Sequence, residues 1–430
     1  MKKYIALFLI VVSLSRAYYI YNRHGAQCRD DSSSIDQQMV HFLQEYIRIN
    51  TTHPTPDYES ALTFLKKHAH QDGFAYQEVA LPSGKKVLII TLQGSDPSLQ
   101  PLALNHHMDV VPALDAEQWI TPPFAGQLYQ NHIVGRGAQD MKGIAALHYY
   151  ALKEFKQTYG QPRRTVHLFA VPDEEIGGFT GTQEFVKTDT FKKLNIGYVI
   201  DEGHASGNRH ILDIKVAERK PIQIEVTSYG ALAHGSHLQA DNAIHTLITF
   251  LQELITIHRA QQQLIGTKQP GELLSCNITS LTAGIKKENG HIALNMVPDC
   301  ARATVDIRVP PGCACSEIIT ILENLIKGYP TLEYTILARA HEEPKIDNYE
   351  TRLYKKLAQS IKEYGLDTRP HFFEASSDLR FYQALGIEGV GLTPFTIEDN
   401  IHGTNESVPV PQLIRGKEIF VQFLKDFCSP

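Results

Sequence analysis

Apolar and polar positions alternate along this chain with helical spacing in some stretches and with strand-like spacing in others. Apolar residues recur every three to four positions in several stretches, which predicts amphipathic helices. Short apolar runs bounded by glycine, proline and serine lie between these stretches and predict strands. The predicted helices are residues 35–49, 59–71, 141–159 and 180–191, and the predicted strands are residues 86–94, 101–111, 163–171 and 196–201. This alternation predicts an α/β fold, a sheet covered by helices with chemically active residues in the loops that leave the strands.

The pattern changes near Glu218. Residues 219–338 predict the order strand, helix, strand, strand, helix, strand, which is typical of a ferredoxin-like α+β module. Beyond this module a helical stretch and a short apolar run return to the earlier pattern. We therefore predict a larger α/β domain in two parts, 33–218 and 339–430, interrupted by an inserted domain over 219–338.

The first residues form a different pattern. Two lysines precede an apolar run over residues 5–14, and Ser15 and Ala17 supply small residues at the position of a cleavage site. The run is too short to cross a bilayer, which takes about 20 apolar residues. Residues 1–17 are therefore predicted to be a signal peptide that exports the protein. The alternative is an uncleaved membrane anchor that continues beyond Arg16.

Composition narrows the class of protein. The chain has 430 residues, of which 43% are hydrophobic and 20% charged, as in a globular protein of more than one domain. The net charge of -6 arises from interspersed charges of both signs, which leaves no basic face for nucleic acid. The six cysteines are sparse and form no C-x-x-C pair. The expected substrate is therefore a small molecule or a peptide.

Residues 171–178 read VPDEEIGG and place Asp173, Glu174 and Glu175 side by side after an apolar run. Neighbouring carboxylates repel one another and are poor strand formers, so this stretch costs stability unless a cation or a proton offsets the charge. A solvated acidic turn is the ordinary structural explanation of an isolated Asp-Glu-Glu. The functional explanation is a metal site, which requires further ligands at other strand ends.

Such ligands occur at the predicted strand ends. His107 and Asp109 form an H-x-D pair in which the carboxylate can hydrogen-bond the ring of a ligating histidine and select its tautomer. Asp140 follows a strand and precedes a helix, Glu202 ends a strand, and His402 lies in a loop. Each residue alone has an ordinary explanation, because an aspartate before a helix is usually a cap.

Taken together, two histidines and several carboxylates suit a pair of divalent ions such as Zn²⁺, about 3.5–4 Å apart. One bridging aspartate, with one histidine and one glutamate for each ion, uses the whole set. Glu175 is then a metal ligand. Glu174 is left as a general base, which takes a proton from water and gives it to the leaving amine.

Several motifs of the chain resemble those of the dinuclear-zinc M20 metallopeptidases, and within that family the aminoacylase branch. The resemblance extends in order from about residue 40 to 420. The stretches that carry it include NHHMDVVP, GRGAQDMK, VPDEEIGG, NITSLTAGI, NMVPDCARATVDIR, SSDLRF and HGTNE. It implies a zinc-peptidase-like catalytic domain with a mixed sheet, two Zn²⁺ ions per subunit, and an inserted lid domain that forms a homodimer.

The resemblance also implies a role for each site residue. The implied metal ligands are His107, Asp140, Glu175, Glu202 and His402, with Asp140 bridging the two ions. The implied catalytic residues are Glu174 as general base, Asp109 as the residue that orients His107, and His234, which reaches into the site of the partner subunit to stabilise the oxyanion. The implied substrate-binding residues are Asn295, Arg308 and Arg380, and the two arginines fit a substrate carboxylate. His106, which the motif does not require, is expected to face the other side of the strand.

The function implied is hydrolysis of the amide of an N-acyl-L-amino acid to a carboxylate and a free amino acid. Two alternatives share this chemistry: a dipeptidase or carboxypeptidase, and a hydrolase of N-fatty-acyl amino acids. A non-catalytic binding protein on the same scaffold is disfavoured, because it has no need of Glu174. The chain contains neither the G-x-S-x-G motif of serine hydrolases nor the H-E-x-x-H motif of zincins.

Overall fold

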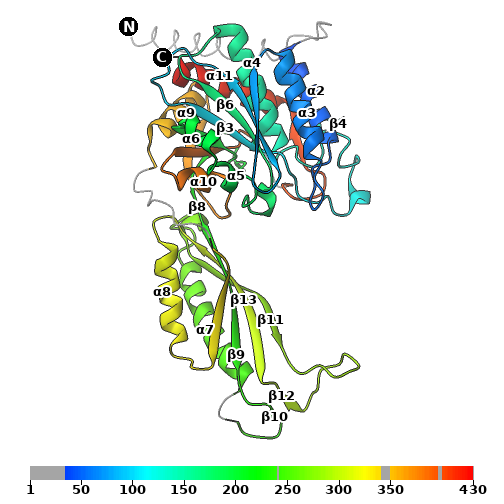
Figure 1. Ribbon diagram of the computed structural model, residues 1–430, viewed down its shortest axis with the longest axis vertical. Helices are drawn as coiled ribbons and strands as arrows, with labels where there is room; N and C mark the ends of the chain where they lie inside the picture. The colour runs from blue at the N-terminus through cyan, green and yellow to red at the C-terminus, as the bar shows by residue number, and fades with distance from the viewer. Residues whose placement is uncertain (1–33, 240–241, 340–348, 396–399, 430) are drawn as a thin grey trace, which may run out of the picture.

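The computed structural model describes residues 34–429 except 240–241, 340–348 and 396–399 (Figure 1). The predicted signal peptide over residues 1–17 lies outside the described residues. Within the described part, no helix combines the length and the apolar character that crossing a bilayer requires.

A mixed sheet of eight strands forms the centre of the larger domain, in the order β1-β2-β6-β3-β7-β16-β8-β15. Its strands are β1 (Ala75–Ala80), β2 (Lys86–Leu92), β3 (Leu102–His107), β6 (Val166–Val171), β7 (Tyr198–Asp201), β8 (Ile211–Glu218), β15 (Asp367–Phe373) and β16 (Glu388–Leu392). The central strands β6, β3, β7 and β16 are mutually parallel. Their carboxyl ends therefore meet at one edge of the sheet, where ligand sites form in such folds.

Helices cover both faces of this sheet, and the alternation along β2 shows why. Leu88 and Ile90 belong to the larger apolar core, while Val87 and Ile89 belong to the smaller core on the opposite face. The helices of the larger core are α2 (Ile35–Arg48), α3 (Tyr58–Gln71), α4 (Lys142–Tyr159), α9 (Arg352–Glu363) and α11 (Val410–Cys428). Those of the smaller core are α5 (Thr182–Phe185), α6 (Asp189–Leu194) and α10 (Leu379–Gln383). The predicted α/β architecture is confirmed.

The inserted part of the chain forms a separate antiparallel sheet in the order β11-β13-β9-β14. Its elements are β9 (Lys220–Tyr229), α7 (Ala243–Gln262), β11 (Ser275–Ala283), β13 (Cys300–Val309), α8 (Cys315–Ile326) and β14 (Leu332–Arg339). Both helices pack on the sheet around a core of their own. We call this part the lid domain, and Figure 1 shows it extending away from the larger domain. At its far end β10 (Ala233–His234) pairs with β12 (Met296–Val297).

Several elements differ from the prediction. The single helix predicted over residues 180–191 is two short helices, because Thr188 caps α6 by accepting a hydrogen bond from the Phe191 N–H. Strands β1, β8 and β15 and helix α11 were not predicted. A further, small sheet also forms from β4 (Gln127–Tyr129), β5 (His132–Val134) and β17 (Ser407–Pro409).

Candidate metal centre

The five predicted metal ligands converge at the carboxyl edge of the large sheet. His107 is the last residue of β3, and Glu202 directly follows β7. Asp140 lies in the turn that precedes α4, Glu175 lies in a 3-10 turn after β6, and His402 lies in the loop that precedes β17. Because β3, β6 and β7 are adjacent and parallel, residues far apart in the sequence lie together here.

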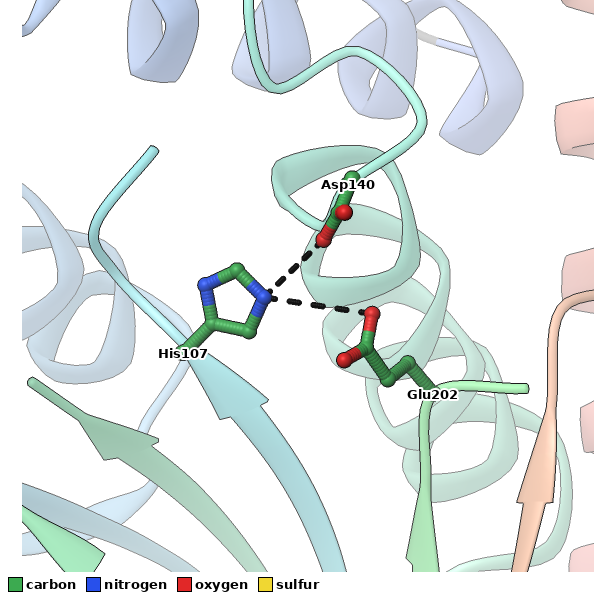
Figure 2. A group of neighbouring side chains, drawn as sticks. All are labelled: His107, Asp140 and Glu202. Atoms are coloured by element: carbon green, nitrogen blue, oxygen red, sulfur yellow. Dashed lines mark hydrogen bonds and ion pairs between the residues drawn. The ribbon is translucent and has the colours of Figure 1, made fainter. Parts of the chain in front are cut away.

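These residues form two groups that share Asp140. In the first group the His107 Nε2 atom lies 3.0 Å from Asp140 Oδ1 and 3.8 Å from Glu202 Oε2, and Figure 2 shows the three side chains converging. In the second group the His402 Nε2 atom lies 3.1 Å from Asp140 Oδ2 and 3.4 Å from Glu175 Oε2. Each oxygen of Asp140 thus faces a different histidine, as a carboxylate that bridges two ions requires.

The side chains fit a pair of divalent ions. Within each group the candidate ligand atoms lie within 4.8 Å of one another. Burial and the nearby Asp140 charge raise the pKa of Glu202 to about 8, so this carboxylate is costly to ionise without a cation. The Glu175 Oε1 atom is buried and has no hydrogen-bond partner in the described part of the chain. A donor set of nitrogen and oxygen atoms of this kind suits Zn²⁺ and related ions.

Protons compete with metal ions for this centre. The hydrogen bond to Asp140 is the main cause that raises the pKa of His402 to about 10, and burial raises that of Glu202 to about 8. Both groups are therefore protonated near pH 7 without a metal, and both must lose a proton to bind one. We expect Zn²⁺ binding to release protons and to tighten as the pH rises from about 6 to about 8. Calorimetric titrations in two buffers of different ionisation enthalpy measure this release, and identical binding heats in both buffers contradict it.

Asp109 orients this centre through its backbone as well as its carboxylate. The His107 Nδ1–H donates to the Asp109 backbone carbonyl at 2.9 Å, and since a carbonyl only accepts, the Nε2 lone pair faces the ion position. The Asp109 carboxylate, predicted to make that contact, lies 3.7 Å from Nδ1. It accepts instead from the backbone N–H groups of Glu174 and Glu175, at 3.2 and 3.0 Å. Asp109 thus positions both the histidine and the acidic turn.

The three adjacent acidic residues have different surroundings. Asp173 is fully buried and does not line the cavity that adjoins the metal centre. Its carboxylate accepts from Tyr58 and Thr180 and pairs with Lys85. Its φ of 68° turns the chain so that Glu174 and Glu175 line the cavity instead. The solvated acidic turn is therefore not what the structure shows.

Two glycines complete this turn. Gly177 has a φ of 102°, a conformation that glycine adopts without strain. At Gly178 an added Cβ would lie 2.4 Å from Asp378 Oδ1, so a side chain has no space there. The glycine pair therefore lets the acidic turn pack closely against the loop that precedes α10.

Glu174 has the environment of a general base. Burial is the main cause that raises its pKa well above the usual value, and the Glu202 charge raises it further. It belongs to neither ligand group, yet it lines the same cavity as Asp140, Glu175 and Glu202. A carboxylate that holds a proton readily and stands beside a metal pair suits proton transfer from water to a leaving group.

A cavity of about 860 Å³ adjoins the centre and is lined by both domains. Two predicted substrate residues line it: Arg308 from β13 and Arg380 from α10. Arg308 pairs with Asp306 through Nε and Nη2, and the Arg380 Nη2 atom donates to the Gly177 carbonyl at 2.7 Å. These contacts hold two guanidinium groups at the cavity, and a guanidinium group can bind a carboxylate through two parallel hydrogen bonds.

His234 and Asn295 lie elsewhere. They are neighbours at the far end of the lid domain, where the His234 Nε2 atom is 3.5 Å from the Asn295 amide, and both are exposed. Neither lines the cavity, and Figure 1 shows β10 and β12 at the end of the lid domain opposite the larger domain. The structure thus does not bring these two residues to the metal centre of their own chain.

Other residues near the centre were given no role from the sequence or were expected to be structural. His106 is fully buried on the side of β3 away from the ions, 3.5 Å from the Tyr46 hydroxyl, as expected, and burial holds its pKa well below the usual value. His53 was missed, although its Nε2 atom lies 3.1 Å from the Asp109 carboxylate. Arg136 and Glu406 were also missed. The only signal for these two was their place inside the motifs that contain Asp140 and His402.

The fold and this centre together define a metal-dependent hydrolase with an inserted α+β domain. The model of the peptidase family M20/M25/M40 matches residues 103–426. The chain therefore belongs to this family, and its predicted membership is confirmed.

Individual relatives and structures agree with this membership. Aminoacylase-1 of Dictyostelium discoideum is 31% identical, covering 92% of this chain and 98% of the relative. The N-fatty-acyl-amino acid synthase/hydrolase PM20D1 of Xenopus tropicalis is 24% identical, covering 96% of this chain and 91% of the relative. The crystal structure of the M20 metallo-carboxypeptidase Sso-CP2 of Sulfolobus solfataricus superposes with a TM-score of 0.70 at 17% identity, over 90% of this chain and 99% of that one.

Proposed function

We propose that this protein is a zinc-dependent aminoacylase that hydrolyses N-acyl-L-amino acids. The observation that carries the proposal is a pair of ligand groups sharing Asp140, with Glu174 in the same cavity. Similarity to aminoacylase-1 over nearly the whole chain supports this substrate class. The arginines of the cavity fit the free carboxylate that every such substrate carries.

The chain's own residues account for substrate binding and proton transfer. When bound, a pair of divalent ions lowers the pKa of water and polarises the amide carbonyl. Arg380 and Arg308 bind the substrate carboxylate and so place the amide at the metal centre. Glu174 takes a proton from the attacking water as the new C–O bond forms, and then gives it to the leaving nitrogen as the C–N bond breaks. The products are a carboxylate and a free amino acid.

A homodimer completes this proposal. His234 and Asn295 have their polar side chains exposed, yet within one chain they lie at the far end of the lid domain from the centre. In a symmetric dimer formed through the lid domains, each His234 enters the site of its partner. There the imidazole stabilises the negative charge that develops on the carbonyl oxygen.

A small substrate panel tests the function. We expect the purified protein, without residues 1–17 and loaded with Zn²⁺, to hydrolyse N-acetylmethionine faster than a free dipeptide or N-oleoylphenylalanine. Acyl preference depends on the apolar lining of the cavity, where one methylene changes discrimination by about 10–200-fold. Hydrolysis of the oleoyl substrate alone moves the assignment to N-fatty-acyl amino acids, which the similarity to PM20D1 supports as the second candidate. Binding of two ions without hydrolysis of any substrate contradicts the proposed function.

A further inference from the structure

A buried carboxylate organises the turn that contains the shared ligand. Glu406 is fully buried, and each of its oxygens accepts two hydrogen bonds. Oε1 accepts from the backbone N–H groups of Gln139 and Asp140, at 2.8 and 3.1 Å. Oε2 accepts from the Gly137 N–H at 3.0 Å and from the Arg136 Nη1 atom at 2.7 Å. Four donors on a single carboxylate determine the path of the backbone through Asp140.

The same arginine reaches the loop of the second histidine. Arg136 is 2% exposed, and its Nη2 atom donates to the backbone carbonyls of His402 and Pro112, at 3.1 and 3.3 Å. His402 has a φ of 63°, a conformation that costs energy for any residue with a side chain and persists only where its surroundings hold it. We call Glu406 and Arg136 together the clasp. It joins the turn of Asp140 to the loop of His402.

The two histidines of the centre are held in different ways. The His107 side chain is 1% exposed, so packing within the sheet and its hydrogen bond to the Asp109 carbonyl orient its ring. The His402 side chain is 52% exposed, so little packing surrounds its ring. The position of His402 therefore depends mainly on its backbone, which the clasp holds.

We propose that the clasp sets the affinity of the second ion position, formed by Asp140, Glu175 and His402. Glu406 and Arg136 are positioning residues that contact neither ion nor substrate. Without the clasp, His402 is free to leave its left-handed conformation, and the second position loses a ligand. The first position shares Asp140, whose backbone N–H the clasp holds, but it retains His107 and Glu202, neither of which touches the clasp, so it is expected to weaken less. The inference rests on the proposed function only in requiring two ions.

Zn²⁺ affinities of variants test this inference. We expect Glu406→Gln to weaken the second ion about 10–100-fold, the usual loss when a residue that supports a metal ligand is replaced, and the first ion by much less. Arg136→Lys provides a second variant that keeps the charge and the fold. Arg136 uses Nη1 for Glu406 and Nη2 for the His402 and Pro112 carbonyls, and the ammonium of lysine lacks this fork of two separate donor groups, so the second ion again weakens. Competition with a chromophoric zinc chelator gives both dissociation constants without any substrate.

Lys417→Met is the matched control. Lys417 is 2% exposed and pairs with Asp36 and Glu154 among α2, α4 and α11, so this variant also breaks a buried ion pair. It should lower the unfolding temperature but leave both ion affinities unchanged. Wild-type affinity for the second ion in both clasp variants overturns the inference, as does an equal weakening in Lys417→Met. A wild-type protein that binds fewer than two ions contradicts the proposed function instead.

Discussion

Replacing Glu174 by glutamine is expected to reduce kcat about 10²–10⁴-fold, the usual contribution of a positioned general base, while both ions still bind. Glutamine has nearly the shape of glutamate but cannot accept and return a proton. Glu174 belongs to neither ligand group, so its loss leaves the metal centre complete. Steady-state kinetics with N-acetylmethionine and zinc analysis of the same samples give both quantities. KM should change little, because the residues proposed to bind the substrate carboxylate, Arg308 and Arg380, are unchanged.

The matched control is Glu184→Gln, the same chemical change on α5. The Glu184 carboxylate accepts from the backbone N–H of Ser83 and does not line the cavity. This variant should retain wild-type kcat. A Glu174→Gln protein that keeps its activity and its two ions excludes Glu174 as the base. One that loses the ions makes Glu174 a metal-binding residue.

A mixed dimer of two inactive chains is expected to recover activity. His234→Ala removes the donor to the developing oxyanion, which should lower kcat about 10²–10³-fold. A heterodimer of a Glu174→Gln chain and a His234→Ala chain still contains one complete site, because the second chain keeps Glu174 and receives His234 from the first. Its activity should be about half that of the wild-type dimer, one working site out of two. Co-expression with two different tags and tandem purification isolates this heterodimer for assay.

The reciprocal heterodimer is the control. A wild-type chain paired with a chain that carries both substitutions has no complete site if His234 acts across the dimer. If His234 acts within its own chain, this control keeps about half the activity and the first heterodimer keeps none. The two arrangements therefore give opposite results. A monomeric protein with full activity contradicts the proposed role of His234 altogether.

Much of the fold was readable from the sequence, because its signals are local. Periodic apolar positions predicted α2, α3 and α4, and the strand-helix order predicted the lid domain. The prediction failed for elements that lack a strong local signal. β15 begins with the polar residues Asp367, Thr368 and Arg369 and contains Pro370, and it forms because it pairs in parallel with β8. The prediction merged α5 and α6 into one helix. They are separated by Thr188, whose hydroxyl caps α6, and a single threonine is not a strong helix-stop signal in the sequence.

The site residues also divide into those that the sequence predicted and those whose contacts only the structure showed. The residue types at the strand ends predicted the candidate metal ligands, and the structure places Glu175 in a ligand group and Glu174 outside both groups. The sequence could not show that Asp109 binds His107 through its carbonyl, since that depends on the backbone path after β3. Nor could it assign Asp173, whose partner Lys85 comes from a turn far along the chain. The Asp173–Lys85 contact joins residues that are 88 positions apart, and such a contact has no periodic signal in the sequence.

The sequence by itself determined the family, most of the elements and the residue types of the candidate ligands, because motifs and periodicity are properties of neighbouring residues. Only the tertiary structure decided the geometry: two ligand groups sharing Asp140, a clasp that joins it to His402, and a His234 that lies far from its own centre. The ligand groups and the clasp arise where parallel strands bring distant loops to one edge of a sheet, whereas the position of His234 depends on the length of the lid domain. The distances between such loops depend on the packing of the whole domain, which no local stretch of sequence contains.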